Sequence, residues 1–150
     1  MYSQELQCAL QPSFRRALLE QQDFKAALPY FSKGLAIEEK ALGPKHPNTA
    51  DTLARIGETY LQMGQPDNAV APLERAWGIQ ADRAAPPPEV ASVAFALARA
   101  LTGTHSTAPD RAVTLARRAR ELAATAADGE SKTATLAEID DWLSAHARHR

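Results

Sequence analysis

Histidines and carboxylates are the side chains of this 150-residue chain that could carry chemistry, and their spacing argues against catalysis. His146 and His149 are three residues apart and could weakly chelate a metal, but their place beside arginines better suits the negative end of a last helix. His46 precedes a proline and is better explained as part of a helix start than as a catalytic or metal-binding residue. Adjacent acids such as Glu38 and Glu39 diverge on a helix and make no acid–base pair.

Arginines provide one basic patch, formed by Arg117, Arg118 and Arg120. A nucleic-acid site would need a larger excess of positive charge with interleaved aromatics, whereas the net charge is −1. We therefore favour a solvated helix face; steep salt-dependent retention on DNA would revive the other interpretation. The sequence also lacks a phosphate-binding loop, a nucleophile elbow and a zinc-protease motif, so we expect no enzyme, no metal and no cofactor.

Composition indicates an ordinary soluble globular domain, with 45% hydrophobic and 23% charged residues. Cys8 is the only cysteine, which excludes a disulfide framework and suits a reducing compartment. The start of the chain does not resemble a signal peptide, and no apolar run reaches the roughly 18 residues of a membrane span. These features predict a cytoplasmic protein without a membrane partner.

A repeated pattern organises the chain. The run Ala27-Leu-Pro-Tyr-Phe returns in altered form from Ala69 and again from Ala112, with a period of about 42 residues. A repeat of this length indicates a stacked helical array, because one helix pair cannot bury its apolar face alone. The expected fold is all-α: a right-handed α-solenoid of stacked antiparallel helix pairs with about seven helices.

Apolar spacing and turn residues place the helices. A first helical segment at 2–22 is interrupted near Gln11 by Pro12. The further expected helices span 23–42, 47–63, 67–83, 88–101, 110–127 and 131–145. Asp23 is the expected N-cap of the first of these, and Pro29 is expected within that helix's first turns, where a lost hydrogen bond costs least.

Three residues carry expectations about packing. Gly57 would cost about 1 kcal/mol relative to alanine in a helix interior, so we expect a close approach by the neighbouring helix to compensate for it. Trp77 and Trp142 lie at core spacing and are predicted to be packing residues whose indole N–H groups need partners if buried.

The turn between the second and third expected helices carries a family resemblance. Leu42-Gly43-Pro44-Lys45-His46-Pro47 between two amphipathic helices resembles the long tetratricopeptide repeats of kinesin light chains and many bacterial proteins. The general repeat pattern is also met by Gly57, Tyr60, Gly64, Ala69 and Ala76. The third unit departs from it, since Ala98 replaces the helical glycine and a longer turn follows.

The resemblance implies one repeat domain over 1–150. Its expected units are a partial first unit at 1–22, central units at 23–64 and 65–103, a last unit with a C-terminal capping helix at 104–146, and a tail at 147–150. Tyr2, Leu6 and Leu10 have no earlier helix to cover them. We therefore expect either a chain cut from a longer array or self-association through this N-terminal helix.

The resemblance also implies where a partner binds, because repeats of this family use the concave face of the array. The expected groove residues are Asp51, Ala54, Glu58, Leu61, Gln62, Ser92, Phe95, Arg99, Ala137 and Asp141. Phe95 is a candidate aromatic anchor, although rotation into the core stays an equal alternative. Asp51 and Glu58, seven residues apart on one face, could receive a basic peptide or form a solvated surface.

Two functions remain open from the sequence. The first is a non-catalytic protein–protein interaction module that holds a peptide or a partner helix in its groove. The alternative comes from the ending, residues 95–143, which is similar to the C-terminal repeat region of bacterial serine/threonine protein kinases. No glycine-rich loop, HRD or DFG sequence is present. That similarity would make the chain a regulatory or substrate-recruiting arm of a bacterial kinase signalling system.

Overall fold

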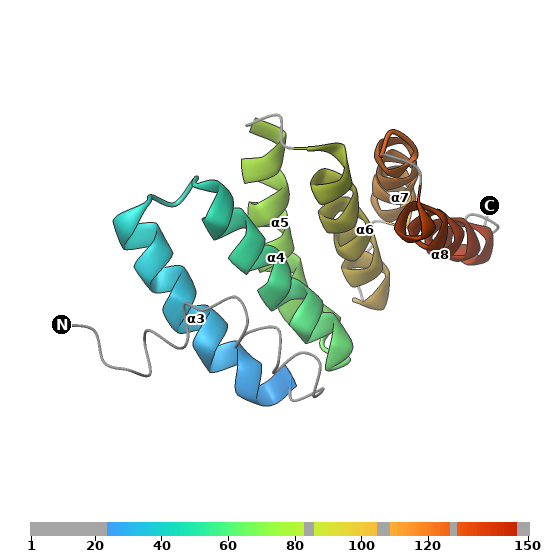
Figure 1. Cartoon of the computed structure of the whole chain (residues 1–150). Helices are drawn as coiled ribbons and strands as arrows, with labels where there is room; N and C mark the ends of the chain where they lie inside the picture. Colours follow the sequence, from blue (N-terminus) through green and yellow to red (C-terminus); the bar gives the residue numbers. More distant parts are fainter. Residues whose placement is uncertain (1–23, 83–85, 105–108, 127–128, 147–150) are drawn as a thin grey trace.

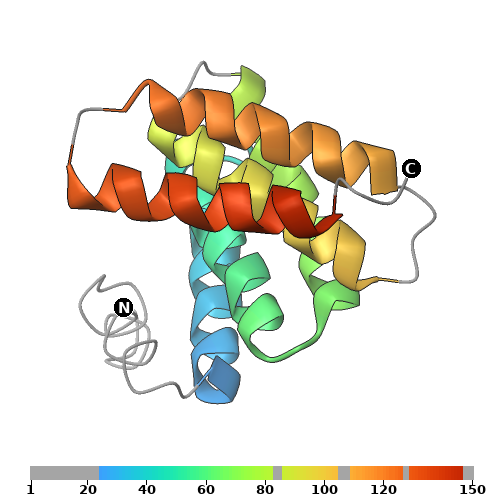
Figure 2. The same ribbon diagram turned by 90° about the vertical axis from the view of Figure 1, so that its right-hand side faces the viewer.

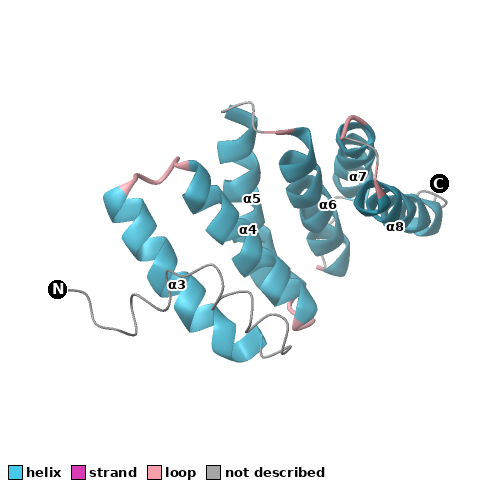
Figure 3. Ribbon diagram, in the orientation of Figure 1, coloured by secondary structure: helices cyan, strands magenta, loops and turns pink. Residues whose placement is uncertain are grey.

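The computed structural model describes residues 24–82, 86–104, 109–126 and 129–146, and within these ranges the chain is helical without any strand (Figures 1 and 3). The helices are α3 (Phe24–Ala41), α4 (Pro47–Gln62), α5 (Pro66–Asp82), α6 (Pro87–Gly103), α7 (Pro109–Ala124) and α8 (Glu130–His146). The predicted all-α array is confirmed for these six helices. The expected helix within 2–22, with its uncovered apolar side, and the expected cap at Asp23 lie outside the described residues.

The six helices lie side by side in chain order, and each packs against the next along the chain (Figure 1). A contact between α4 and α6 joins the first helices of successive pairs. The array also twists along its length, because α7 and α8 cross α3 and α4 steeply (Figure 2). Within the last pair, α7 and α8 run antiparallel to each other. No helix among the described residues is both long and apolar enough to span a membrane.

The turn between α3 and α4 shows why the sequence ends one helix and starts the next here. Gly43 has a φ of +100°, a left-handed conformation that glycine adopts without a steric penalty. His46 is the N-cap of α4, and its Nδ1 accepts a hydrogen bond from the Asn48 N–H at 3.2 Å. Thr49 adds a hydroxyl bond to the Gly43 carbonyl at 3.0 Å. The interpretation of His46 as a helix-start residue is confirmed.

Two of the helices continue through an internal proline. Pro29 follows the first turn of α3, which begins at Phe24, and Pro72 lies inside α5. Each proline removes the donor that would bond the carbonyl four residues earlier, on Lys25 or Asn68. Both of these residues are exposed, so water can satisfy the two carbonyls and the helices continue.

The core consists of small and branched apolar residues from every described helix. Phe31, Leu73, Leu97 and Ile139 are its largest fully buried apolar side chains, with alanines closing the remaining helix contacts. Leu73 of α5 packs directly onto Gly57 of α4: a Cβ at Gly57 would lie 2.7 Å from Leu73 Cδ2 and closer still to Leu73 Cγ. The predicted close approach at Gly57 is therefore confirmed.

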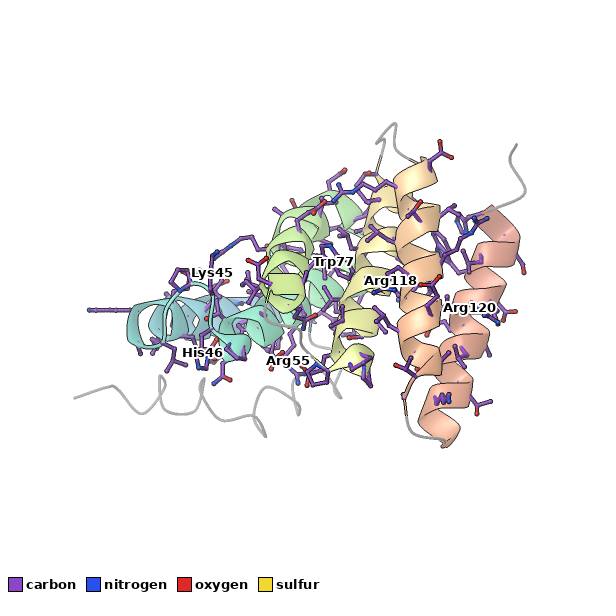
Figure 4. All side chains as sticks on the ribbon, turned by 90° about the horizontal axis from the view of Figure 1, so that it is seen from above. Lys45, His46, Arg55, Trp77, Arg118 and Arg120 are labelled. Carbon is purple, nitrogen blue, oxygen red and sulfur yellow. The ribbon has the colours of Figure 1, made fainter. Side chains whose placement is uncertain are left out.

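The two tryptophans pack against this core without being enclosed by it. Trp77 of α5 and Trp142 of α8 are both half-buried. Figure 4 shows Trp77 among the helices of the array. The prediction that both are packing residues holds, while their partial exposure allows their indole N–H groups to reach solvent.

Two ion pairs connect the second helices of successive pairs, α3 with α5 and α5 with α7. Arg75 of α5 pairs with Glu39 of α3 at 2.6 Å, and Arg111 of α7 pairs with Glu74 of α5 at 2.7 Å. Two members of the predicted basic patch are also paired: Arg118 with Glu121 in the same helix and Arg120 with Asp140 of α8 (Figure 4). This pairing fits a solvated helix face better than a nucleic-acid surface.

Candidate peptide-binding groove

Two adjoining cavities lie against α4 and α6, and we refer to them together as the groove. The larger has a volume of about 590 Å³ and is lined by α4, α6, α8 and the first residue of α3. Its lining residues are Phe24, Arg55, Glu58, Thr59, Leu61, Gln62, Ser92, Phe95, Ala96, Arg99, Thr135 and Glu138. Three helices that are far apart in sequence therefore contribute to one surface depression.

The smaller cavity lies towards the start of α4 and α6 and has a volume of about 260 Å³. Its lining residues are Asp51, Ala54, Arg55, Glu58, Gln80, Glu89, Ser92 and Val93. Arg55, Glu58 and Ser92 line both cavities, so the two form one continuous feature. We call the smaller cavity the acidic end of the groove.

The structure brings together most of the residues that the sequence assigned to a groove. The eight from α4 and α6 line one or both cavities: Asp51, Ala54, Glu58, Leu61, Gln62, Ser92, Phe95 and Arg99. Ala137 and Asp141 of α8 line neither cavity, and Thr135 and Glu138 lie there instead. The repeat spacing matches Asp141 to Glu58, but α8 crosses the earlier helices (Figure 2) and presents a different face.

Phe95 is a wall of the groove rather than an open aromatic anchor. Its side chain is only 7% exposed. Its ring meets that of Trp142 edge-on, with centroids 6.1 Å apart at 86°, and the Arg99 guanidinium lies 6.0 Å from its centroid. Of the two alternatives left open for Phe95, the structure therefore supports burial, with a small exposed part of the side chain lining the cavity.

The C-terminal turn of α8 supports Trp142 from the other side. The imidazole of His146 stacks on the indole, with centroids 4.2 Å apart and planes inclined by 14°. His146 Nδ1 also lies 2.8 Å from the Trp142 carbonyl oxygen. The histidine thus acts on the last turn of the helix, as expected, and no group of three or more metal-ligating side chains occurs among the described residues.

Charged side chains of both signs line the groove. Arg99 of α6 reaches Glu138 of α8 at 3.7 Å, which links the two walls of the larger cavity. Glu58 lies in the fields of both Arg55 and Arg99, and Arg55 projects from α4 in Figure 4. Burial raises the pKa of the Glu58 carboxyl, an effect that the two arginines oppose. The Glu58 side chain is nevertheless exposed to solvent. The burial that raises its pKa therefore comes from the protein atoms that surround the open cavity.

Several lining residues were missed from the sequence. Arg55 is one that spacing could have identified, because positions 51, 55, 58 and 62 follow one another on a single helical face. Glu138 could not be identified this way, since its position depends on how α8 crosses α6. Gln80 belongs to a second helix, which the sequence did not assign to the groove at all.

Residues 16–80 match the family model of the tetratricopeptide repeat, in agreement with the stacked helical fold. The structure of the chain is similar to the crystal structure of TPR-like repeats of a protein assigned as a kinesin light chain of Podosopora anserina. The TM-score is 0.73 at 21% identity, over 97% of this chain and 72% of that one.

A point variant of the same Podosopora anserina protein gives the same TM-score of 0.73 at 21% identity, over 98% of this chain and 72% of that one. At this identity the likeness shows the fold alone. No match was found among curated proteins. None of these comparisons supports the similarity of the ending to bacterial kinases, which stays a prediction.

Proposed function

We propose that this chain is a non-catalytic protein-interaction module that binds a peptide or a partner helix along the groove. One observation carries the proposal: α4, α6 and α8 together line a continuous depression of about 590 Å³. This volume lies within the roughly 300–1,000 Å³ typical of ligand sites. Repeat proteins of stacked helices use such surfaces for binding. The single cysteine supports a cytoplasmic location as part of the same proposal.

The lining of the groove suits a peptide better than a small apolar ligand. Leu61, Ala96 and the edge of Phe95 provide apolar contact, while Gln62 and Ser92 can bond to a peptide backbone. The charged side chains of Arg55 and Glu58 line the same cavity. A peptide presents both backbone polar groups and alternating side chains, which matches this mixture.

A peptide-display selection on the immobilised full chain tests the proposal. The selected peptides are then measured by fluorescence anisotropy against the chain and two variants. Ser92→Trp places a large side chain where the two cavities meet, whereas Thr114→Trp places the same side chain on the exposed surface of α7, outside both cavities. We expect Ser92→Trp to weaken binding more than about tenfold and Thr114→Trp to change it less than about twofold. Equal effects of the two variants would contradict the proposal.

A further inference from the structure

We infer from the geometry that the acidic end of the groove receives the side chain of a lysine or arginine from the bound peptide. This inference rests on the proposed function and names the chemistry of the partner at one position. Three carboxylates, from Asp51, Glu58 and Glu89, line the acidic end against the single cation of Arg55. The local charge is therefore negative in a chain whose net charge is only −1.

The carboxylates of Asp51 and Glu89 are available to a ligand. Both side chains are exposed, and neither makes an ion pair within the part of the chain that the structure describes. The larger cavity differs, because Arg99 there is already paired with Glu138 at 3.7 Å. Unmatched negative charge thus collects at one end of the groove only.

Gln80 is an independent observation that points to a hydrogen-bond donor at the same place. Its side chain is only 2% exposed and lines the acidic end. Its Oε1 is buried and accepts no hydrogen bond from the described residues. A buried acceptor without a donor is rare in folded proteins, because the lost hydrogen bond to water is then not replaced and folding costs more free energy. A bound ammonium or guanidinium group would supply the missing donor.

The combination of groups selects the class of ligand. Carboxylates with an amide oxygen bind organic cations through charge-assisted hydrogen bonds, and lysine and arginine carry donors only. An anion would meet the same carboxylates unfavourably. Because Ser92 and Glu58 line both cavities, a peptide lying in the larger cavity can place one side chain in the acidic end.

Fluorescein-labelled hexalysine is the probe for this inference, measured by anisotropy on the full chain at low ionic strength. The test variant is Asp51→Asn with Glu89→Gln. Its control, Glu121→Gln with Asp141→Asn, removes the same two kinds of charge from exposed positions outside both cavities. We expect the test variant to bind hexalysine more than about tenfold more weakly, and the control to stay within about twofold of the unmodified chain. Equal weakening in both would mean general charge attraction and would overturn the inference.

The side-chain amide of Gln80 gives a second readout. In ¹⁵N-labelled protein, hexalysine should shift the Gln80 amide resonances, and these shifts should be absent with neutral hexaserine. Failure of the inference is separable from failure of the proposed function. If display-selected peptides bind and Ser92→Trp blocks them, but hexalysine leaves Gln80 unmoved, the groove binds peptides and the acidic end does not select a cation.

Discussion

Leu73 of α5 fills the space that a side chain on Gly57 of α4 would need. A Cβ at Gly57 would lie 2.7 Å from Leu73 Cδ2 and 3.0 Å from Leu73 Cδ1, and Leu73 itself is fully buried. The absence of a side chain therefore sets how closely the two helices of this pair approach.

Gly57→Ala is expected to destabilise the fold. Alanine gains about 1 kcal/mol of helix propensity, but overpacking a filled core typically costs about 1–3 kcal/mol. Because Leu73 cannot turn away without moving other buried side chains, we expect the overpacking cost to exceed the propensity gain, with a net loss of up to about 2 kcal/mol by urea unfolding. Gly78→Ala is the control: Gly78 is exposed in α5, and a Cβ added there would meet nothing within 4 Å, so this variant should gain about 0.5–1 kcal/mol. A stabilised Gly57→Ala would contradict this packing.

His46→Ala is expected to lower stability by about 0.5–1 kcal/mol, because the Asn48 N–H at the start of α4 loses its acceptor. His46→Asp should restore the lost stability, since aspartate is a strong N-cap residue. Chemical denaturation of the three proteins measures both effects. If alanine and aspartate behaved alike, the cap would not be the role of this histidine.

The raised pKa of Glu58 has a consequence for the pH dependence of stability. The folded chain holds this proton more tightly than the unfolded chain, whose carboxyl keeps the ordinary value of 4.5. Stability should therefore fall as pH rises from about 4.5 through the folded pKa. Glu58→Gln removes this contribution, so relative to the unmodified chain it should gain stability as pH rises from about 4 to 7. Urea unfolding across that range measures the difference; a gap that stays constant with pH would contradict the assignment.

The ion pair between Arg75 and Glu39 should contribute little and should weaken with salt. Both side chains are partly exposed, so Arg75→Gln should cost only about 0.2–1 kcal/mol at low salt and less at about 1 M salt. Arg117→Gln is the matched control, since Arg117 is exposed and forms no ion pair among the described residues. Thermal unfolding at low and high salt distinguishes the two variants. An equal loss of stability in both would show that the ion pair does not stabilise the fold.

The order and limits of the helices could be predicted because local signals mark them. Gly43 ends one helix through its backbone conformation and His46 caps the next through its side chain, and both effects depend on neighbouring residues alone. The close approach at Gly57 was also predictable, because a glycine inside a helix needs compensation. The groove residues of α4 and α6 followed from helical spacing together with the resemblance to the repeat family.

The groove residues of α8 could not be predicted in the same way. Asp141 corresponds to Glu58 by repeat spacing, yet the crossing of α8 over the earlier helices brings Glu138 to Arg99 instead. That crossing involves contacts distant in sequence, such as the packing of Phe95 against Trp142. Gln80 of α5 could not be predicted either. Its place in the groove depends on how α5 packs against α4, which is a long-range contact rather than a local signal.

Binding of a peptide along α4, α6 and α8 can be observed by titrating the ¹⁵N-labelled chain with a display-selected peptide and following backbone amide shifts. The largest shifts should fall on lining residues such as Leu61, Ser92 and Arg99, with little change at Arg117 and Glu121 of α7. Largest shifts on the exposed face of α7, with the lining residues unmoved, would contradict it.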